Sequence, residues 1–192
     1  MPKTSLLVAV LDACVLYPPS LRDLFMRLAS GLVFQPRWTE EIHDEWMRNV
    51  LKDRPQITHP QLERTRRLMD QISDESLVTG YEIHIPALTL PDPNDRHVLA
   101  AAITGEASVI VTFNLADFPQ AALAPFGVRA LHPDNYLTAL LKDAPDLFLA
   151  SVRAHRVSLT RPPKTAEADL ETLKANHLVQ LAQQLASYDA EL

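Results

Sequence analysis

The chain has little cysteine and little glycine, and both shortages narrow the kinds of protein it can be. A single cysteine, Cys14, excludes an internal disulfide and a zinc site built from several cysteines. The 4 glycines, against 15 prolines, leave few positions for left-handed turns and many stiff boundaries between segments. No residue near Cys14 marks a partner base, so we interpret Cys14 as a buried structural thiol rather than a nucleophile.

Long hydrophobic runs are also missing, and no segment approaches the uncharged length that spans a bilayer. The N-terminus, MPKTSLLVAVLDACVLYPP, superficially resembles a signal peptide. However, Asp12 interrupts its apolar region, and no small-residue cleavage site follows cleanly. We therefore interpret residues 5–11 as a core strand and predict a cytoplasmic protein that makes no membrane contact.

The chain has no excess of positive charge. Its net charge of −6 argues against a protein that coats nucleic acid by bulk electrostatics, although an enzyme acting on nucleic acid needs only a locally favourable groove. Residues 46–68 are net positive and contain Arg48, Lys52, Arg54, Arg64, Arg66 and Arg67 against Asp53 and Glu63. This stretch is either a solvated helix face or a contact surface for nucleic acid.

Apolar runs and helix-capping residues alternate through the first 132 residues, which favours an α/β fold with a parallel sheet. The sequence predicts strands at residues 5–11, 32–34, 82–87, 108–112 and 128–131. It predicts helices at residues 21–30, from the Thr39 cap onward, at 60–76 and at 95–105. In the helix at 60–76, Leu62 and Leu68 are expected to face the core and the arginines to face largely outward.

From residue 133 onward the pattern changes to helices without intervening strands. The sequence predicts helices at residues 134–142, 145–157 and 165–188. We therefore predict an α/β domain at residues 1–132 and a helical C-terminal extension at residues 133–192.

Oxygen-bearing side chains lie where predicted strands end and helices begin. Asp12 directly follows the first strand, Glu45 lies in the second turn of its helix, and Asp95 lies in the first turn of another. Asn114 and Asp117 come directly after the strand that contains SVIVT. Because the carboxyl ends of parallel strands meet at one edge of a sheet, we expect these side chains to form one acidic pocket.

Clustered carboxylates repel one another, and a hard divalent cation relieves that repulsion. Mg²⁺ and Mn²⁺ prefer oxygen donors, and one or two such ions can orient a phosphodiester, generate hydroxide and stabilise the leaving oxygen. Zinc fits less well, because the 7 histidines are scattered and no HExxH pattern occurs. The sequence therefore predicts a Mg²⁺ or Mn²⁺ site.

Each of these residues also has a purely structural interpretation when it is taken alone. Asp12 could cap the end of its strand, and Glu45 could be a surface glutamate. Asp95 could interact favourably with the positive end of the dipole at the start of its helix, and Asp117 could cap a turn with Asn114. Their combination in this order favours a functional site.

Four segments within residues 6–119 match a known family in order and spacing. They are LDACVLYP, PRWTEEIHDEW, LPDPNDRHVLAAAI and VTFNLADFP. Together they resemble the PIN-domain nucleases, especially the VapC-like toxins of toxin–antitoxin modules, and a PIN subgroup that often has a helical C-terminal extension. The resemblance implies a PIN-like three-layer fold, in which helices flank a central parallel sheet, with the nuclease domain at residues 1–132.

The resemblance also implies roles for individual residues. Asp12, Glu45 and Asp95 would be the core metal-binding acids. Many relatives have aspartate where Asn114 stands, so Asn114 would ligate weakly or orient a water molecule, and Asp117 would supply the fourth acidic group. Asp12, Glu45, Asp95 and Asp117 are therefore the predicted catalytic residues.

The residues around these acids are expected to shape the pocket and contact substrate. Thr112 would set the pocket by hydrogen bonding. Arg96, Arg48 and Arg37 are candidate phosphate contacts, although each also has a structural interpretation.

The implied reaction is Mg²⁺- or Mn²⁺-dependent hydrolysis of single-stranded or structured RNA by the toxin of a type II toxin–antitoxin module. The implied partner is a small antitoxin that inserts a basic side chain near the acids and neutralises the charge that recruits metal. The helices after residue 133 would close the groove, bind the antitoxin or support a homodimer, or would only pack.

Other functions are compatible with the same residues. The sequence leaves open a PIN nuclease of RNA maturation or decay and a PIN module that binds RNA or protein without cleaving. A haloacid-dehalogenase-like phosphatase is disfavoured, because Cys14 stands where a second aspartate is expected. A dinucleotide-binding enzyme is disfavoured, because no glycine-rich turn follows the first strand.

Overall fold

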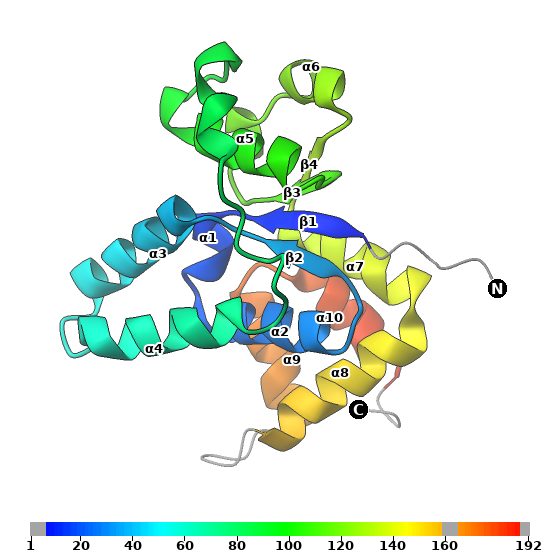
Figure 1. Cartoon of the computed structure of the whole chain (residues 1–192). Helices are drawn as coiled ribbons and strands as arrows, with labels where there is room; N and C mark the ends of the chain where they lie inside the picture. The colour runs from blue at the N-terminus through cyan, green and yellow to red at the C-terminus, as the bar shows by residue number, and fades with distance from the viewer. Residues whose placement is uncertain (1–6, 159–164, 189–192) are drawn as a thin grey trace.

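The computed structural model describes residues 7–158 and 165–188 and is built on a four-stranded parallel sheet (Figure 1). The strands are β1 (Val8–Leu11), β2 (Gln35–Arg37), β3 (Val109–Val111) and β4 (Arg129–Leu131). Their order is β2-β1-β3-β4, and Val10 of β1 aligns with Arg37 and Ile110 on its two neighbours. The prediction of a parallel α/β sheet is confirmed.

Helices cover both faces of the sheet (Figure 1). On one face lies α5 (Arg96–Thr104), whose residues 97–102 are all buried; on the other lie α2 (Pro19–Ser30), α7 (Pro133–Asp143) and α10 (Val179–Ala186). The other helices are α1 (Ala13–Leu16), α3 (Glu40–Asp53), α4 (His59–Asp70), α6 (Gln120–Leu123), α8 (Pro145–Ser158) and α9 (Ala166–Ala175). The predicted three-layer arrangement is therefore confirmed, and within the described residues no helix has the length and apolar character needed to cross a membrane.

Two predicted strands are wrong in type or position. Residues 82–87 form the 3-10 helices η1 (Tyr81–Ile83) and η2 (Ile85–Ala87), because Gly80 turns the chain at φ 76° and Pro86 has no N–H for a strand ladder. The second strand lies at β2 instead of residues 32–34, since Leu32 has a positive φ of 58° in the turn after α2.

Two predicted helices are too long. The helix predicted at 60–76 is α4, which starts after a Thr58 capping box and ends at Asp70, and Leu68 on it is 58% exposed rather than buried. The helix predicted at 165–188 is divided into α9 and α10, because His177 adopts a left-handed φ of 62° between them.

The side chain of Asp134 holds α10 against α7. Asp134 is buried, and its two oxygens accept hydrogen bonds from the backbone N–H groups of Gln180 and Leu181, both 2.9 Å long. These N–H groups belong to the first turn of α10 and have no partner within that helix. A carboxylate at this position also stabilises α10, because its negative charge lies at the positive end of the helix dipole.

We expect Asp134→Ala to lower the free energy of unfolding by about 1–3 kcal/mol, because it leaves the buried N–H of Leu181 and the partly buried N–H of Gln180 without an acceptor. Urea denaturation measures this loss. Asp143→Ala, at the exposed end of the same helix, is the matched control and should leave stability nearly unchanged. Equal stability of the two variants would contradict this account.

Candidate metal centre

The side chain of Asp12 is fixed in orientation at the end of β1. Asp12 is 5% exposed and caps α1, where its Oδ1 accepts from the backbone N–H of Ala13 at 2.7 Å. Its Oδ2 accepts from Thr112 Oγ1 at 2.6 Å and from Cys14 Sγ at 3.2 Å. A buried carboxylate held by three donors is preorganised rather than mobile.

Thr112 connects the ends of β1 and β3 at this point. Its hydroxyl donates to Asp12 and accepts from the backbone N–H of Asn114 at 3.0 Å. Its own backbone N–H donates to Leu131 of β4. The backbone of Asn114 is therefore held near Asp12, while its side chain is exposed.

Cys14 supports the Asp12 carboxylate and is not activated. Burial, followed by the negative charge of Asp12, raises the pKa of the Cys14 thiol to about 12. A thiol with this pKa is protonated at neutral pH and a poor nucleophile. The interpretation of Cys14 as a structural thiol is consistent with this environment.

Glu45 comes from α3, which starts where Thr39 Oγ1 accepts from the backbone N–H of Ile42. The Glu45 side chain is 37% exposed. Burial raises its pKa, and the nearby charge of Asp12 raises it further, although Arg48 acts in the opposite direction. Glu45 therefore lies within electrostatic range of the strand-end aspartate.

Asp95 is the last residue of η3 (Pro93–Asp95) and the residue before α5. Burial raises the pKa of Asp95 to about 7, and the charges of Asp12, Asp92, Asp117 and Glu45 add to this rise. Carboxylates from distant segments thus act on one another electrostatically, while the prediction that they share one metal site stays a prediction. Such mutual repulsion is the condition that a bound cation relieves.

The charged neighbourhood also contains His97, which the sequence does not distinguish from the other scattered histidines. His97 is 5% exposed; its Nδ1 lies 3.7 Å from Glu41 Oε2, and its Nε2 lies 3.9 Å from Glu45 Oε2. Burial lowers its pKa, while Glu41 and Asp12 oppose that shift. No signal in the sequence around His97 distinguishes it, because Glu41 and Glu45 lie more than 50 positions away.

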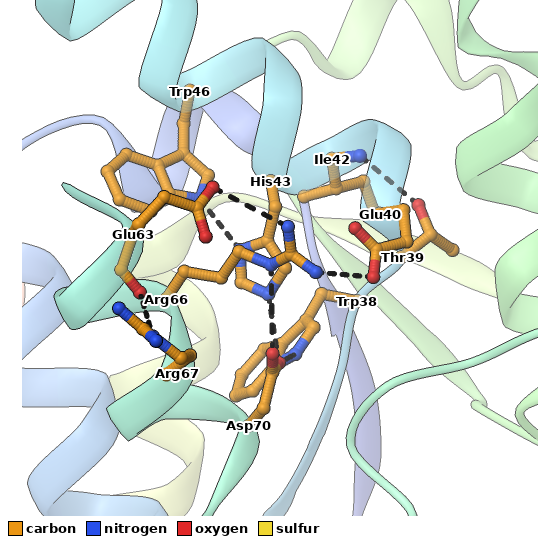
Figure 2. A network of polar contacts seen from close by, with 10 residues as sticks. All are labelled: Trp38, Thr39, Glu40, Ile42, His43, Trp46, Glu63, Arg66, Arg67 and Asp70. Carbon is orange, nitrogen blue, oxygen red and sulfur yellow. Dashed lines mark hydrogen bonds and ion pairs between the residues drawn. The ribbon is translucent and has the colours of Figure 1, made fainter. Parts of the chain in front are cut away.

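A buried polar network anchors α3, the helix that carries Glu45 (Figure 2). The ring of His43 is fully buried, accepts from Trp46 Nε1 at 3.0 Å through Nδ1, and pairs with Asp70 Oδ1 at 3.1 Å through Nε2. Trp38 Nε1 donates to the same Asp70 oxygen at 2.8 Å. The network joins Trp38, directly after β2, to α3 and α4, so Glu45 is presented on a firmly held helix.

Arg48 and Arg96, which are predicted to contact phosphate, differ in their surroundings. Arg48 is exposed and close enough to Glu45 to oppose the rise in its pKa. Arg96 Nε donates to the Pro93 carbonyl at 2.8 Å, within the turn that presents Asp95. A role of Arg48 or Arg96 in substrate binding stays a prediction.

Two other basic side chains are occupied by local partners. Arg37 is buried and donates to Glu75 at 2.8 Å and to the backbone carbonyl of Gly105 at 3.3 Å. Arg66, expected to face outward, is 20% exposed and forms an ion pair with Glu40 (Figure 2). These partners reduce the positive charge that the two arginines offer to a nucleic acid.

The donor chemistry of this region fits a hard cation, because Asp12, Glu45, Asp95 and Asp117 offer carboxylate oxygens and Asn114 an amide oxygen. Within residues 7–158 and 165–188, no three His, Cys, Asp or Glu side chains lie close enough together to hold a metal ion as they stand. Mg²⁺ sites of the kind that retain water and use substrate phosphate need only one or two carboxylates. The assignment of individual ligands stays a prediction.

Thr112→Val is expected to lower the free energy of unfolding by about 1–3 kcal/mol, because the buried Asp12 carboxylate loses its shortest hydrogen bond. Thr112→Ser keeps the hydroxyl and is the matched control. Urea denaturation compares the two variants, and Mn²⁺ titration shows whether the orientation of Asp12 is also lost. Equal effects of valine and serine would mean that the hydroxyl does not hold Asp12.

We expect Mn²⁺ binding to weaken as the pH falls through about 7, because Asp95 then takes up a proton. Calorimetric titrations in buffers of different ionisation enthalpy measure the proton released on binding. Without metal, stability should fall as the pH rises from 3.8 toward about 7, since the raised pKa means that the folded state binds the proton more tightly. Asp95→Asn should abolish both dependences; their persistence in this variant would assign them to another group.

Comparison with known proteins agrees with this architecture. Residues 8–116 match the PIN domain family, and residues 133–187 match the VapC50 C-terminal domain. A protein of Mycobacterium tuberculosis (strain ATCC 25618 / H37Rv) named "Putative ribonuclease VapC50" is 42% identical over 83 residues, which cover 41% of this chain and 47% of that protein. The matched part thus spans less than half of that relative, and no solved structure matches the chain significantly. The chain belongs to the PIN-domain family, and its predicted resemblance to VapC-like members with a helical C-terminal extension is confirmed.

Proposed function

We propose that this chain is a divalent-metal-dependent endoribonuclease that hydrolyses RNA phosphodiesters and acts as the toxin of a type II toxin–antitoxin module. The observation that carries the proposal is the electrostatic coupling of Asp12, Glu45 and Asp95, which come from three distant segments of a PIN domain. Their shared negative field, around an Asp12 side chain held by Thr112, supports a site for a cation and an RNA phosphate.

In this proposal, Asp12, Glu45 and Asp95 hold Mg²⁺ or Mn²⁺, and Asn114 and Asp117 complete the oxygen-donor set. When bound, such a metal neutralises phosphate charge and lowers the pKa of water to supply a nucleophile.

The residues of the chain itself bind and orient. Thr112 holds the Asp12 carboxylate in one orientation through a hydrogen bond of 2.6 Å. The carboxylate therefore loses little conformational entropy when it binds a cation. Asp95, whose pKa is about 7, releases a proton as it becomes a ligand. Arg48, exposed beside Glu45, and Arg96, in the turn that presents Asp95, are the proposed contacts for the RNA backbone.

The proposed partner is a short cognate antitoxin, and the similarity to the VapC50 protein supports this proposal. Its basic side chain would occupy the negative field of the acids and compete with the cation. We propose a division of the chain into a nuclease domain at residues 1–132 and an extension at residues 133–192, which the separate family matches at 8–116 and 133–187 support. The proposed setting is the cytoplasm, and the proposed oligomeric state is a homodimer, which light scattering measures.

Asp12→Asn, Glu45→Gln and Asp95→Asn are each expected to abolish metal-dependent cleavage of RNA, because each removes a charged ligand while keeping the shape of the side chain. Asp117→Asn should have a milder effect that added Mn²⁺ partly restores. Cleavage-site mapping on total RNA, with and without EDTA, measures the activity. Asp143→Asn, on the exposed end of α7, is the matched control.

Cleavage that persists in all three variants, or in EDTA, would reject the assignment of the acids. Circular dichroism and urea denaturation of the same variants separate a lost ligand from a lost fold. Co-expression with the product of a neighbouring short reading frame tests the toxin role; a nuclease that no neighbouring product binds or inhibits would belong to RNA maturation or decay instead.

A further inference from the structure

Three aromatic rings meet where β3 and β4 end, and one of them comes from the C-terminal extension. Phe113 follows β3, His132 follows β4, and His177 lies in the turn between α9 and α10. The ring centroids of Phe113 and His132 are 5.1 Å apart, and those of Phe113 and His177 are 6.2 Å apart, both in edge-to-face geometry. We call Phe113, His132 and His177 the ring cluster.

The ring cluster is directly connected to the strand-end aspartate. Phe113 follows Thr112, whose hydroxyl holds Asp12. The backbone N–H of Phe113 also donates to Cys14 Sγ at 3.4 Å, and this thiol donates to Asp12. The rings and the acids therefore share one edge of the sheet.

The rings keep surface available for a ligand. Phe113 and His132 are half-buried, and His177 is exposed. His132 uses Nδ1 to accept from the backbone N–H of Asp134 at the start of α7, whereas the His177 ring makes no hydrogen bond to another described residue. Burial lowers the pKa of His132, which favours an uncharged ring and a stacking contact over an ionic one.

The backbone of His177 is held in an uncommon conformation at this point. Its φ of 62° lies in the left-handed region, which a residue with a side chain adopts at a cost. The preceding Asn176 anchors the turn, because its Nδ2 donates to Ser20 Oγ at 3.0 Å and to the Thr172 carbonyl at 2.7 Å. This left-handed turn caps the C-terminus of α9, where the backbone N–H of Leu178 donates to the Leu173 carbonyl at 2.9 Å, and it places the His177 ring beside Phe113.

We propose that the ring cluster is a stacking site for a base of the RNA strand whose phosphodiester lies at the acids; this inference rests on the proposed nuclease function. Aromatic side chains next to a backbone-binding site are the usual means of holding single-stranded nucleic acid, since every base has a face that stacks. The extension then contributes directly to substrate binding through His177, in addition to packing on the sheet.

Two substitutions remove rings and keep the local structure. His177→Asn retains a residue type that tolerates the left-handed conformation. His132→Asn retains an acceptor that can cap α7. His59→Ala, an exposed histidine in the first turn of α4, is the matched control.

The experiment measures RNA binding by fluorescence anisotropy in the Asp12→Asn background, so that the strand is not cut. The ligands are a short labelled single-stranded RNA with a mapped cleavage site and a panel in which one nucleotide at a time lacks its base. We expect His177→Asn and His132→Asn to weaken binding of the intact RNA about 5- to 160-fold, which corresponds to the loss of about 1–3 kcal/mol for one stacked base. His59→Ala should have no effect.

For one RNA of the panel, the missing base should weaken binding to the His59→Ala control as much as His177→Asn or His132→Asn weakens binding of the intact RNA. The affinity of His177→Asn for that same RNA should be no lower than the affinity of the control for it. The salt dependence of binding should stay unchanged, because stacking neutralises no phosphate. Full affinity of His177→Asn for the intact RNA, or an equal loss on every RNA of the panel, would overturn the stacking site and leave the nuclease proposal standing. If the wild-type protein neither binds nor cleaves RNA with metal, the nuclease proposal fails first.

Discussion

The hydrogen bond from Thr112 to Asp12 is the constraint on which the candidate site depends. It is 2.6 Å long, buried, and joins residues 100 positions apart in the sequence. Because Asp12 follows β1 and Thr112 follows β3, the bond exists only when these two strands are adjacent and in register. The same pairing brings the segment of Asn114 and Asp117 to the end of β1. The orientation of the Asp12 carboxylate is thus a consequence of sheet topology.

Around that hydrogen bond, the fold places carboxylates close enough to repel one another, which is energetically unfavourable. Burial and neighbouring carboxylates raise the pKa of Asp95 to about 7 and also raise that of Glu45, and a cation bound nearby would favour the ionised form of both groups. Rigid supports keep the acids in place: His43, Trp46 and Asp70 anchor α3, and the Arg22 guanidinium stacks over the Trp46 ring at 4.4 Å. Perturbed carboxylates on well-packed elements are typical of functional sites rather than of solvated surfaces.

Several features could be predicted from local sequence, because their causes are local. The Thr39 cap, the Gly105 stop and the apolar run before Asp12 each follow from the chemistry of neighbouring residues. The prediction of a strand at residues 82–87 is wrong, since their composition says nothing about the turn at Gly80 that removes them from the sheet. His97 could not be predicted as part of the site, because its role depends on Glu41 and Glu45, which lie on α3 whereas His97 lies on α5.

The type of fold and the acidic residues worth testing could be predicted from local patterns, because strand and helix signals and capping residues act over a few positions; the family could be predicted from four short motifs that resemble it. The contacts between side chains depend on tertiary packing: Arg66 is paired with Glu40, the pKa of the Cys14 thiol is raised to about 12, and His177 of the extension contacts Phe113. These facts depend on packing between segments far apart in the chain, where burial and proximity change the energy of a charge or a ring. No local pattern encodes that proximity.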